Sequence, residues 1–309
     1  MKPLLVFSFY LLVSTLSLFA QNKETYQFAQ RDSALYLDIL RPENPRDDHA
    51  TVVSLFGGGF ATGRRDTPGQ NRSHQELLDR GFIVVCIDYR LGFKDSAKVA
   101  EYKSLFKLPK LFNYCIDIAV EDCAEAIAWL CRHAEQFDID TSRIILTGCS
   151  AGAVTVLQLD YCRANGMPQT AILPRGWKPA AVVPYSGGVM CRKQDLFYAT
   201  PPAPTMFMHG TKDKIVNYRQ FGLPFSPKLY GASRLSDLFE ENEYPYWFIK
   251  FPGVGHEVCQ WLYGSADLFT AFVNQVLNGH ITTLEATMTD TQLNPTEWSK
   301  MTIFDLYVH

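Results

Sequence analysis

The sequence predicts an α/β fold in which a doubly wound, mostly parallel sheet carries helices on both faces. Two observations lead to this prediction. Runs of consecutive β-forming residues, such as "ATVVSLF" (50–56) and "FIVVCIDY" (82–89), have the uninterrupted apolar character of strands covered on both sides. From about residue 34 onward these runs alternate with helix-like segments, as in sheets whose parallel strands are joined by crossover helices.

Each expected element follows from a local pattern. The segment "ALYLDILRP" (34–42) alternates apolar and polar residues as a strand does, and it stops at a proline. After a long polar and aromatic loop, residues 117–136 place apolar side chains three and four positions apart, which predicts an amphipathic helix. Further strands are expected at 143–148, 180–188, 204–210 and 244–251, and further helices at 151–162 and 265–280.

Composition indicates a globular protein without a nucleic-acid partner. The chain has 309 residues, of which 47% are apolar and 20% charged, and its formal net charge is -3. A mildly acidic chain has no electrostatic footprint for nucleic acid or for an anionic membrane. No linker rich in proline, glycine or serine divides the sequence, so we expect a single domain over residues 21–309.

The N-terminus has the layout of a secretory signal peptide over residues 1–20. It opens with Lys2, remains apolar through Phe19 and offers Ala20 as a small residue before the cut. The alternative is a membrane anchor, since the apolar run is almost long enough to span a bilayer. Three serines dilute the run and a polar segment follows at once. We therefore expect an exported protein, periplasmic or extracellular, with no stable membrane insertion after cleavage.

Eight cysteines in an exported chain raise the question of disulfides. Cys86 lies in a strand-like run, Cys123 on the apolar stripe of a predicted helix and Cys149 in a turn. These positions are typical of small buried hydrophobic residues. One or two bridges involving Cys162, Cys191 or Cys259 stay open at this point.

The stretch "ILTGCSAGA" (145–153) carries a G-x-S-x-G pattern between a predicted strand and a predicted helix. In that context the central serine sits on a sharp strand-to-helix turn and acts as a nucleophile. Ser150 is framed by the two glycines, whereas Cys149 is one position off, where its side chain is expected to point away. We therefore predict Ser150 as the nucleophile.

A serine nucleophile needs a base, and the base needs an orienting acid. His256 lies in the glycine-flanked loop "FPGVGHEV" and is the preferred base among seven histidines, while His209 is expected to be structural. Asp213 follows the strand "PTMFMHG", and Asp195 is a less favoured alternative at a looser distance from its strand. The order serine, aspartate, histidine is the one found in α/β-hydrolases.

Hydrogen-bond donors for an oxyanion complete the predicted site. The segment "SLFGGGFATG" places Gly57, Gly58 and Gly59 directly after a strand, where backbone N–H groups can turn toward the pocket. The N–H of Ala151, next to the nucleophile, adds a further donor. Donors of this kind hold the oxyanion of a tetrahedral intermediate. No cluster of histidine, cysteine and carboxylate has ligand spacing, so neither a metal nor a cofactor is expected.

The motifs together resemble the α/β-hydrolase esterases, in particular carboxylesterases and relatives of hormone-sensitive lipase that carry an HGGGF motif. The resemblance covers about residues 34–278 and is carried by "FGGGFATGRRD", "VVCIDYRLG", "GCSAGA", "HGTKDKIVNY" and "FPGVGHE". It implies Ser150, Asp213 and His256 as the triad, with oxyanion donors at Gly58, Gly59 and Ala151. One departure is Phe56, which stands where the family usually has histidine, so a hydrogen bond that braces the oxyanion loop is expected to be absent.

Substrate class is an expectation by analogy. The mature N-terminus is too short for a helical cap, and no large lid fits between "PYSGG" and "PTMFMHG". An exposed site suits short-acyl or aryl esters on small molecules or on glycans, and the layout is similar to exported bacterial acetylxylan and feruloyl esterases. Two inserts, 91–115 and 218–231, were candidates to shape the pocket. The alternatives are a peptidase of the prolyl-oligopeptidase type and a non-catalytic binding protein on the same fold.

Overall fold

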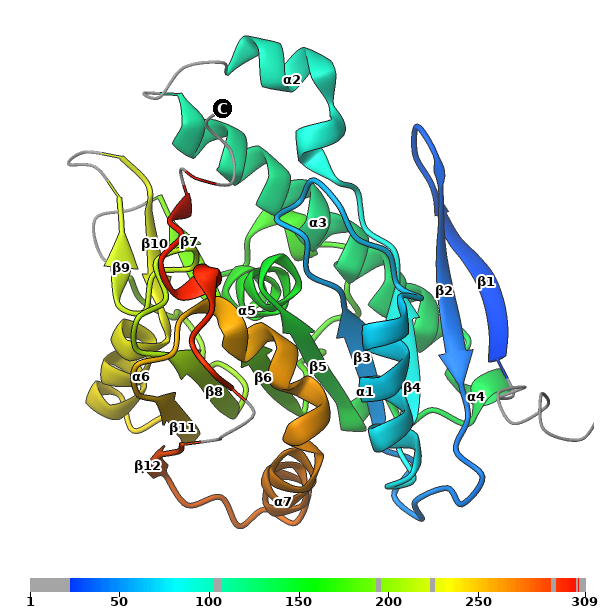
Figure 1. Cartoon of the computed structure of the whole chain (residues 1–309). Coiled ribbons are helices and arrows are strands. Elements are labelled where there is room, and N and C mark those ends of the chain that lie inside the picture. The colour runs from blue at the N-terminus through cyan, green and yellow to red at the C-terminus, as the bar shows by residue number, and fades with distance from the viewer. Residues whose placement is uncertain are drawn as a thin grey trace, which may run out of the picture.

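The predicted α/β architecture is confirmed. The computed structural model describes residues 23–102, 107–192, 196–222, 226–289, 293–303 and 305, and the predicted signal peptide at 1–20 lies outside them. Figure 1 shows a twisted central sheet between helices. In the described residues this sheet has nine strands in the order β1-β2-β4-β3-β5-β6-β8-β11-β12.

The sheet is antiparallel at one edge and parallel elsewhere. The antiparallel pairs are β1 with β2 and β2 with β4, and every other neighbour is parallel. The bounds are β1 (Lys23–Gln30), β2 (Ala34–Leu40), β3 (Thr51–Leu55), β4 (Ile83–Ile87), β5 (Ile144–Cys149), β6 (Ala181–Tyr185), β8 (Thr205–Gly210), β11 (Tyr246–Phe251) and β12 (Leu284–Thr287).

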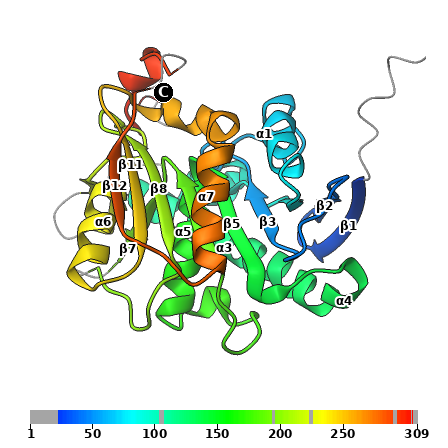
Figure 2. The same cartoon turned by 90° about the horizontal axis from the view of Figure 1, so that it is seen from below.

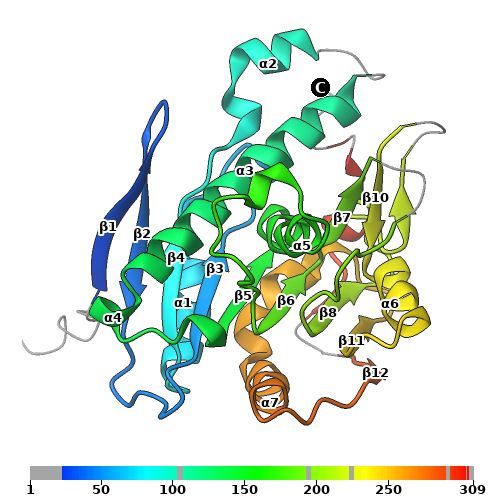
Figure 3. The same ribbon diagram turned by 180° about the vertical axis from the view of Figure 1, so that it is seen from behind.

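Helices cover both faces, and each face has its own apolar core. Figures 2 and 3 show α3 (Leu108–Arg132), α5 (Ala151–Ala164) and α6 (Ala232–Glu241) on one face, with α1 (Pro68–Leu78) and α7 (Ala266–Leu277) on the other. Successive side chains of a strand point to opposite faces of the sheet. In β3, for example, Val53 packs in the core on the α3 side and Val52 in the core on the α7 side. Two short helices are α2 (Ser96–Glu101) and α4 (Ala134–Phe137).

The structure corrects several local predictions. The helix expected at 117–136 begins earlier, at Leu108, and ends at Arg132. Its extra N-terminal turns contain Pro109, which is tolerated in the first helical turn, and bury Phe112. All eight cysteines lie in the described part of the chain and all are free thiols, so the bridges left open at Cys162, Cys191 and Cys259 do not form.

A second, small antiparallel sheet was not predicted. It contains β7 (Gly188–Cys191), β10 (Lys228–Gly231) and β9 (Gln220–Phe221), in that order. Its strands have between two and four residues, too short for a periodic pattern to reveal them. The sheet stands beside the carboxyl ends of β6 and β8 (Figure 1) and contributes one wall of the pocket described below.

The parallel strands bring the chemistry-bearing segments to one edge. β3, β5, β8 and β11 are followed by the glycine loop 57–59, by Ser150, by Asp213 and by the turn that begins at His256. Parallel neighbours expose their carboxyl ends at the same edge, where ligands bind in open α/β sheets. Among the described residues, no helix is both long and apolar enough to span a bilayer.

Candidate active site

Ser150 occupies a strained turn between β5 and α5. Its φ of 52° and ψ of -119° are unusual for a residue with a side chain, and such conformations cost about 1–3 kcal/mol and concentrate at functional sites. The turn is held from both sides. The Ser150 N–H donates to the Tyr185 carbonyl at 3.0 Å, and the Ser150 carbonyl accepts from the Val154 N–H at 2.8 Å.

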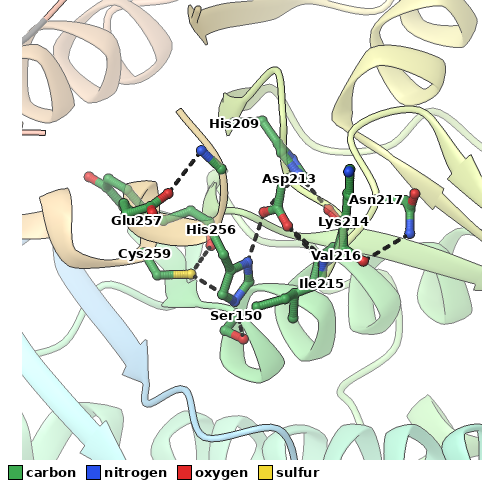
Figure 4. Close-up of polar contacts among 12 residues, drawn as sticks. Ser150, His209, Asp213, Lys214, Ile215, Val216, Asn217, His256, Glu257 and Cys259 are labelled. Atoms are coloured by element: carbon green, nitrogen blue, oxygen red, sulfur yellow. Dashed lines mark hydrogen bonds and ion pairs between the residues drawn. The ribbon is translucent and has the colours of Figure 1, made fainter. Parts of the chain in front are cut away.

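The structure brings Ser150, His256 and Asp213 into one chain of hydrogen bonds (Figure 4). Ser150 Oγ lies 2.8 Å from His256 Nε2, and His256 Nδ1 lies 2.8 Å from Asp213 Oδ2. A carboxylate only accepts, so in the neutral ring Nδ1 carries the hydrogen and Nε2 accepts from the serine hydroxyl. The arrangement has the geometry of a serine activated by an oriented base.

Asp213 is a buried carboxylate whose charge is stabilised from several directions. Its Oδ1 accepts from the N–H groups of Ile215 and Val216, both at 3.0 Å. Its Oδ2 also lies 3.3 Å from Nε2 of His209, which donates to the Val216 carbonyl at 2.8 Å. Burial works against ionisation, but His256 and His209 outweigh it and hold the pKa of Asp213 well below its usual value.

His256 is only 1% exposed, and its environment favours the protonated ring. Burial disfavours the imidazolium, but the Asp213 carboxylate more than offsets it and raises the pKa of His256 well above the ordinary value. Cys259 is a third neighbour, with its Sγ 3.3 Å from His256 Nε2. The imidazole is thus placed to receive a proton from Ser150 and to hold it beside a carboxylate.

The glycine loop passes close to the nucleophile, and its shape is set without a histidine. A Cβ on Gly58, whose φ is +120°, would lie 2.2 Å from the Thr62 carbonyl oxygen, so this position requires glycine. Phe56 stacks on Tyr89 with ring centroids 4.3 Å apart, and the Tyr89 hydroxyl donates to the Phe56 carbonyl at 2.7 Å. Tyr89 therefore braces the loop where the family histidine is missing.

Two of the three predicted anion donors share a pocket with the serine. Ala151 is the first residue of α5, so its N–H is one of those with no acceptor inside the helix, at the positive end of the helix dipole. Gly59 and Ala151 line the same pocket as Ser150. Gly58 adjoins them, and its carbonyl accepts from the N–H groups of Ala61 and Thr62.

Cys149 does not have the properties of a nucleophile. Burial raises the pKa of its thiol to about 12, so it is a neutral thiol near pH 7 and only a thiolate attacks efficiently. It lines a different pocket from Ser150. The two neighbouring side chains therefore point to different sides of the turn, as the sequence indicated.

An apolar pocket of about 120 Å³ opens at Ser150. In the part of the chain that the structure describes, every other lining residue is apolar or glycine: Gly59, Phe60, Leu108, Pro109, Phe112, Ile116, Ala151, Val154, Met190, Ile215, Val216, Phe221, Gly222, Pro227, Leu229 and Ile303. Both predicted inserts contribute, through the start of α3 and through the small sheet. Other aromatic residues of the first insert, Phe93, Tyr102 and Tyr114, pack against the apolar core on the α3 side of the sheet.

The sequence did not indicate the contacts of several neighbours of the site. His209 was expected to be structural, and its ring bonds the Val216 carbonyl in a neighbouring loop and also contacts the Asp213 carboxylate. Glu257 ends the "FPGVGHE" segment and accepts from the Gly255 N–H, while Cys259 and Trp298 reach His256 from segments without a recognisable motif. The alternative acid, Asp195, lies outside the described residues. No group of three or more histidine, cysteine, aspartate or glutamate side chains in the described chain is arranged to hold a metal ion.

Comparison with known sequences points to one family. A family model described as "Carboxylesterase family" matches residues 14–183, more than half of the chain. Lipase 2 from Moraxella sp. (strain TA144) is 32% identical over 110 residues, which cover 36% of this chain and 21% of that protein. Para-nitrobenzyl esterase from Bacillus subtilis (strain 168) is 26% identical over 149 residues, which cover 48% and 28%. The chain thus matches less than a third of the length of these curated relatives.

Solved structures of esterase 2 from Thermogutta terrifontis share the fold. The form phosphorylated by paraoxon is 19% identical with a TM-score of 0.57, covering 84% of this chain and 95% of that one. The propionate-bound form is 21% identical with a TM-score of 0.57, covering 84% and 96%. The butyrate-bound form is 20% identical, with a TM-score of 0.57 and coverage of 84% and 95%. This likeness supports the α/β-hydrolase fold.

Proposed function

Because this chain belongs to the carboxylesterase family, we propose that it is a serine esterase acting on carboxylic esters with short-acyl or aryl acids. One observation carries the proposal. The chain of hydrogen bonds from Asp213 through His256 to Ser150, each 2.8 Å long, ends at an apolar pocket. A nucleophile, an oriented base and a place for an apolar acyl group are the parts that acyl transfer needs.

The proposed reaction proceeds through an acyl-enzyme. His256 takes the proton of Ser150 as the serine attacks the ester carbonyl, and it returns that proton to the leaving alcohol. The N–H groups of Gly58, Gly59 and Ala151 hold the oxyanion, and Asp213 keeps the imidazole in the required tautomer. Water, deprotonated by His256, then attacks the acyl-enzyme and releases the acid and the free serine.

The pocket supports an acyl group without polar atoms. Among the described residues that line it, no side chain other than that of Ser150 offers a hydrogen-bond partner. A polar atom buried without a partner costs about 1–3 kcal/mol. Acetyl and short alkyl groups avoid this cost, whereas the phenolic hydroxyl of a feruloyl group meets apolar walls. The esterase 2 structures that hold propionate and butyrate are compatible with this class.

A second pocket supports a polar alcohol. Cys259 links this pocket to the site, because it lines the pocket and its Sγ lies 3.3 Å from His256 Nε2. Its polar lining includes Arg64, Thr67, Gln70, Ser73 and Gln260. These side chains suit hydroxyl-rich alcohols, and we therefore include acetyl esters of polysaccharides in the proposed class. Residues 1–20 predict an exported protein, and such a protein would meet these substrates outside the cytoplasm. The sequence read from the N-terminus of the exported protein should then begin at Gln21.

The experiment is hydrolysis of p-nitrophenyl esters from acetate to decanoate by the native protein, Ser150→Ala and Cys149→Ala. We expect the highest kcat/KM at short chains. Ser150→Ala should lose at least about 10³-fold in kcat, while Cys149→Ala, the adjacent control, should keep its rate within about threefold.

Two outcomes would contradict the proposal. The first is a native protein that hydrolyses none of the esters, which would favour the peptidase or the non-catalytic interpretation. The second is Ser150→Ala retaining activity while Cys149→Ala loses it, which would move the nucleophile to the thiol. If short-chain activity is found, acetylated and feruloylated glycans are the next substrates to compare.

A further inference from the structure

Near the end of the described chain, the segment Thr296–Ile303 comes back to the catalytic edge of the sheet (red in Figure 1). Glu257, the residue after the proposed base, holds it there. One carboxylate oxygen accepts from the Thr296 N–H and hydroxyl, both at 2.7 Å, and from the Ser299 N–H at 2.9 Å. The other accepts from the Ser299 hydroxyl at 2.8 Å and from the Gly255 N–H at 2.9 Å. The segment and the His256 loop are thus joined through one buried carboxylate.

Trp298 stands on the imidazole of the proposed base. Its ring lies nearly parallel to that of His256, with an interplanar angle of 6° and centroids 5.7 Å apart. Trp298 remains 36% exposed, whereas His256 is 1% exposed. A half-exposed indole therefore lies against a buried imidazole.

The other end of the segment reaches the acyl pocket. The Ile303 N–H donates to the Lys214 carbonyl at 3.3 Å, and Thr302 pairs with Lys214 in a short parallel bridge. Lys214 follows Asp213, so this end is joined to the loop of the proposed acid. Ile303 is buried and lines the pocket opposite the start of α3.

We propose that Thr296–Ile303 is a functional part of the active site, in which Ile303 limits the acyl chain and Trp298 is a positioning residue for His256. The inference rests on the proposed esterase function. A segment fixed to both the base loop and the acid loop can place two side chains accurately, because its own ends are held by hydrogen bonds and not by packing alone.

The Ile303 part is tested by acyl-length profiles on the p-nitrophenyl series. Ile303→Ala should raise kcat/KM for longer esters relative to acetate, by about fourfold for each further methylene that becomes buried, and Ile303→Phe should lower it. Ile303→Val should raise kcat/KM for longer esters as Ile303→Ala does, but by a smaller factor. The valine variant replaces the alanine variant in this test if the latter is unstable. Leu293→Ala is the matched control, since Leu293 is as buried as Ile303 but packs in the opposite core away from the pocket.

The Trp298 part is tested by separating kcat from KM. Trp298→Ala should lower kcat about tenfold, because a displaced base acts poorly even after substrate binds, and should leave KM within about twofold. Trp298→Phe, which keeps a ring over the imidazole, should recover most of the rate. The thermal midpoint of each variant is measured in parallel, so that only folded variants are compared.

The outcomes separate this inference from the proposed function. If the native protein hydrolyses esters and Ser150→Ala does not, but the Ile303 variants keep the native profile and Trp298→Ala keeps the native kcat, the inference is wrong and the esterase function stands. Trp298→Phe as slow as Trp298→Ala would contradict the stacking role. A native protein without esterase activity overturns both.

Discussion

At the residue scale, the site depends on the strained backbone of Ser150 and on the buried charge of Asp213, and neighbouring groups stabilise both. Ser150 keeps a strained backbone because Tyr185 and Val154 bind its N–H and carbonyl. Asp213 keeps a buried charge because two backbone N–H groups and two histidines surround it. A buried carboxylate without such partners would take up a proton instead.

The raised pKa of His256 predicts the pH dependence of the reaction. The base must be neutral to accept the serine proton, so activity is lost as pH falls through its pKa. We therefore expect the acid limb of kcat/KM to have its midpoint above the ordinary histidine value of about 6.5. The check is the pH profile of p-nitrophenyl acetate hydrolysis from pH 5 to 9. A midpoint at or below 6.5 would show that burial outweighs Asp213.

At the element scale, the junction of β5 and α5 places the nucleophile. α5 is buried along nearly its whole length, and it approaches β3 so closely that a Cβ on Gly152 would lie 2.4 Å from the Leu55 carbonyl oxygen. The second glycine of the motif is therefore needed for packing of helix on strand, in addition to the turn itself. This contact also sets the distance from Ala151 to the glycine loop.

Gly152→Ala should separate α5 from β3. We expect a loss of about 1–3 kcal/mol in the free energy of unfolding, as for other overpacked cores, together with a lower kcat. Thermal unfolding and ester hydrolysis measure the two effects. Gly69→Ala is the stability control, because Gly69 lies in α1 with nothing within 4 Å of the added Cβ, and it should raise stability by about 0.4–1 kcal/mol. A Gly152→Ala protein as stable as the native one would contradict the close approach.

At the scale of the whole molecule, the active site is assembled from segments distributed along the chain. The glycine loop, the nucleophile, the acid and the base follow four different strands, and the last described segment closes the pocket. Glu257 joins that segment to the His256 loop. Burial by itself would raise the pKa of Glu257, but hydrogen bonds from Thr296 and Ser299 outweigh it and lower this pKa to about 2.

The depressed pKa of Glu257 makes its contribution to stability dependent on pH. A carboxyl group with a lowered folded-state pKa stabilises the fold above its unfolded value, near 4.5, and loses this effect as pH falls toward 2. Glu257→Gln should therefore lower Tm at pH 7 by a few degrees, and the difference from the native protein should narrow below pH 4.5. Calorimetry at several pH values checks this. A difference that is constant with pH would assign the effect to packing.

The sequence by itself determined seven strands of the main sheet, the helices α3, α5 and α7, and the positions of the proposed triad, whereas β1, β12, α1 and α6 were not predicted. Long apolar runs and helical spacing are local properties, and Ser150, Asp213 and His256 each follow such a run beside a recognisable turn. The tertiary structure alone decided the early start of α3, the small sheet and the roles of His209, Cys259, Glu257, Trp298 and Ile303. Short strands have no period to detect, and these side chains meet the site through contacts between distant segments, which no local pattern encodes.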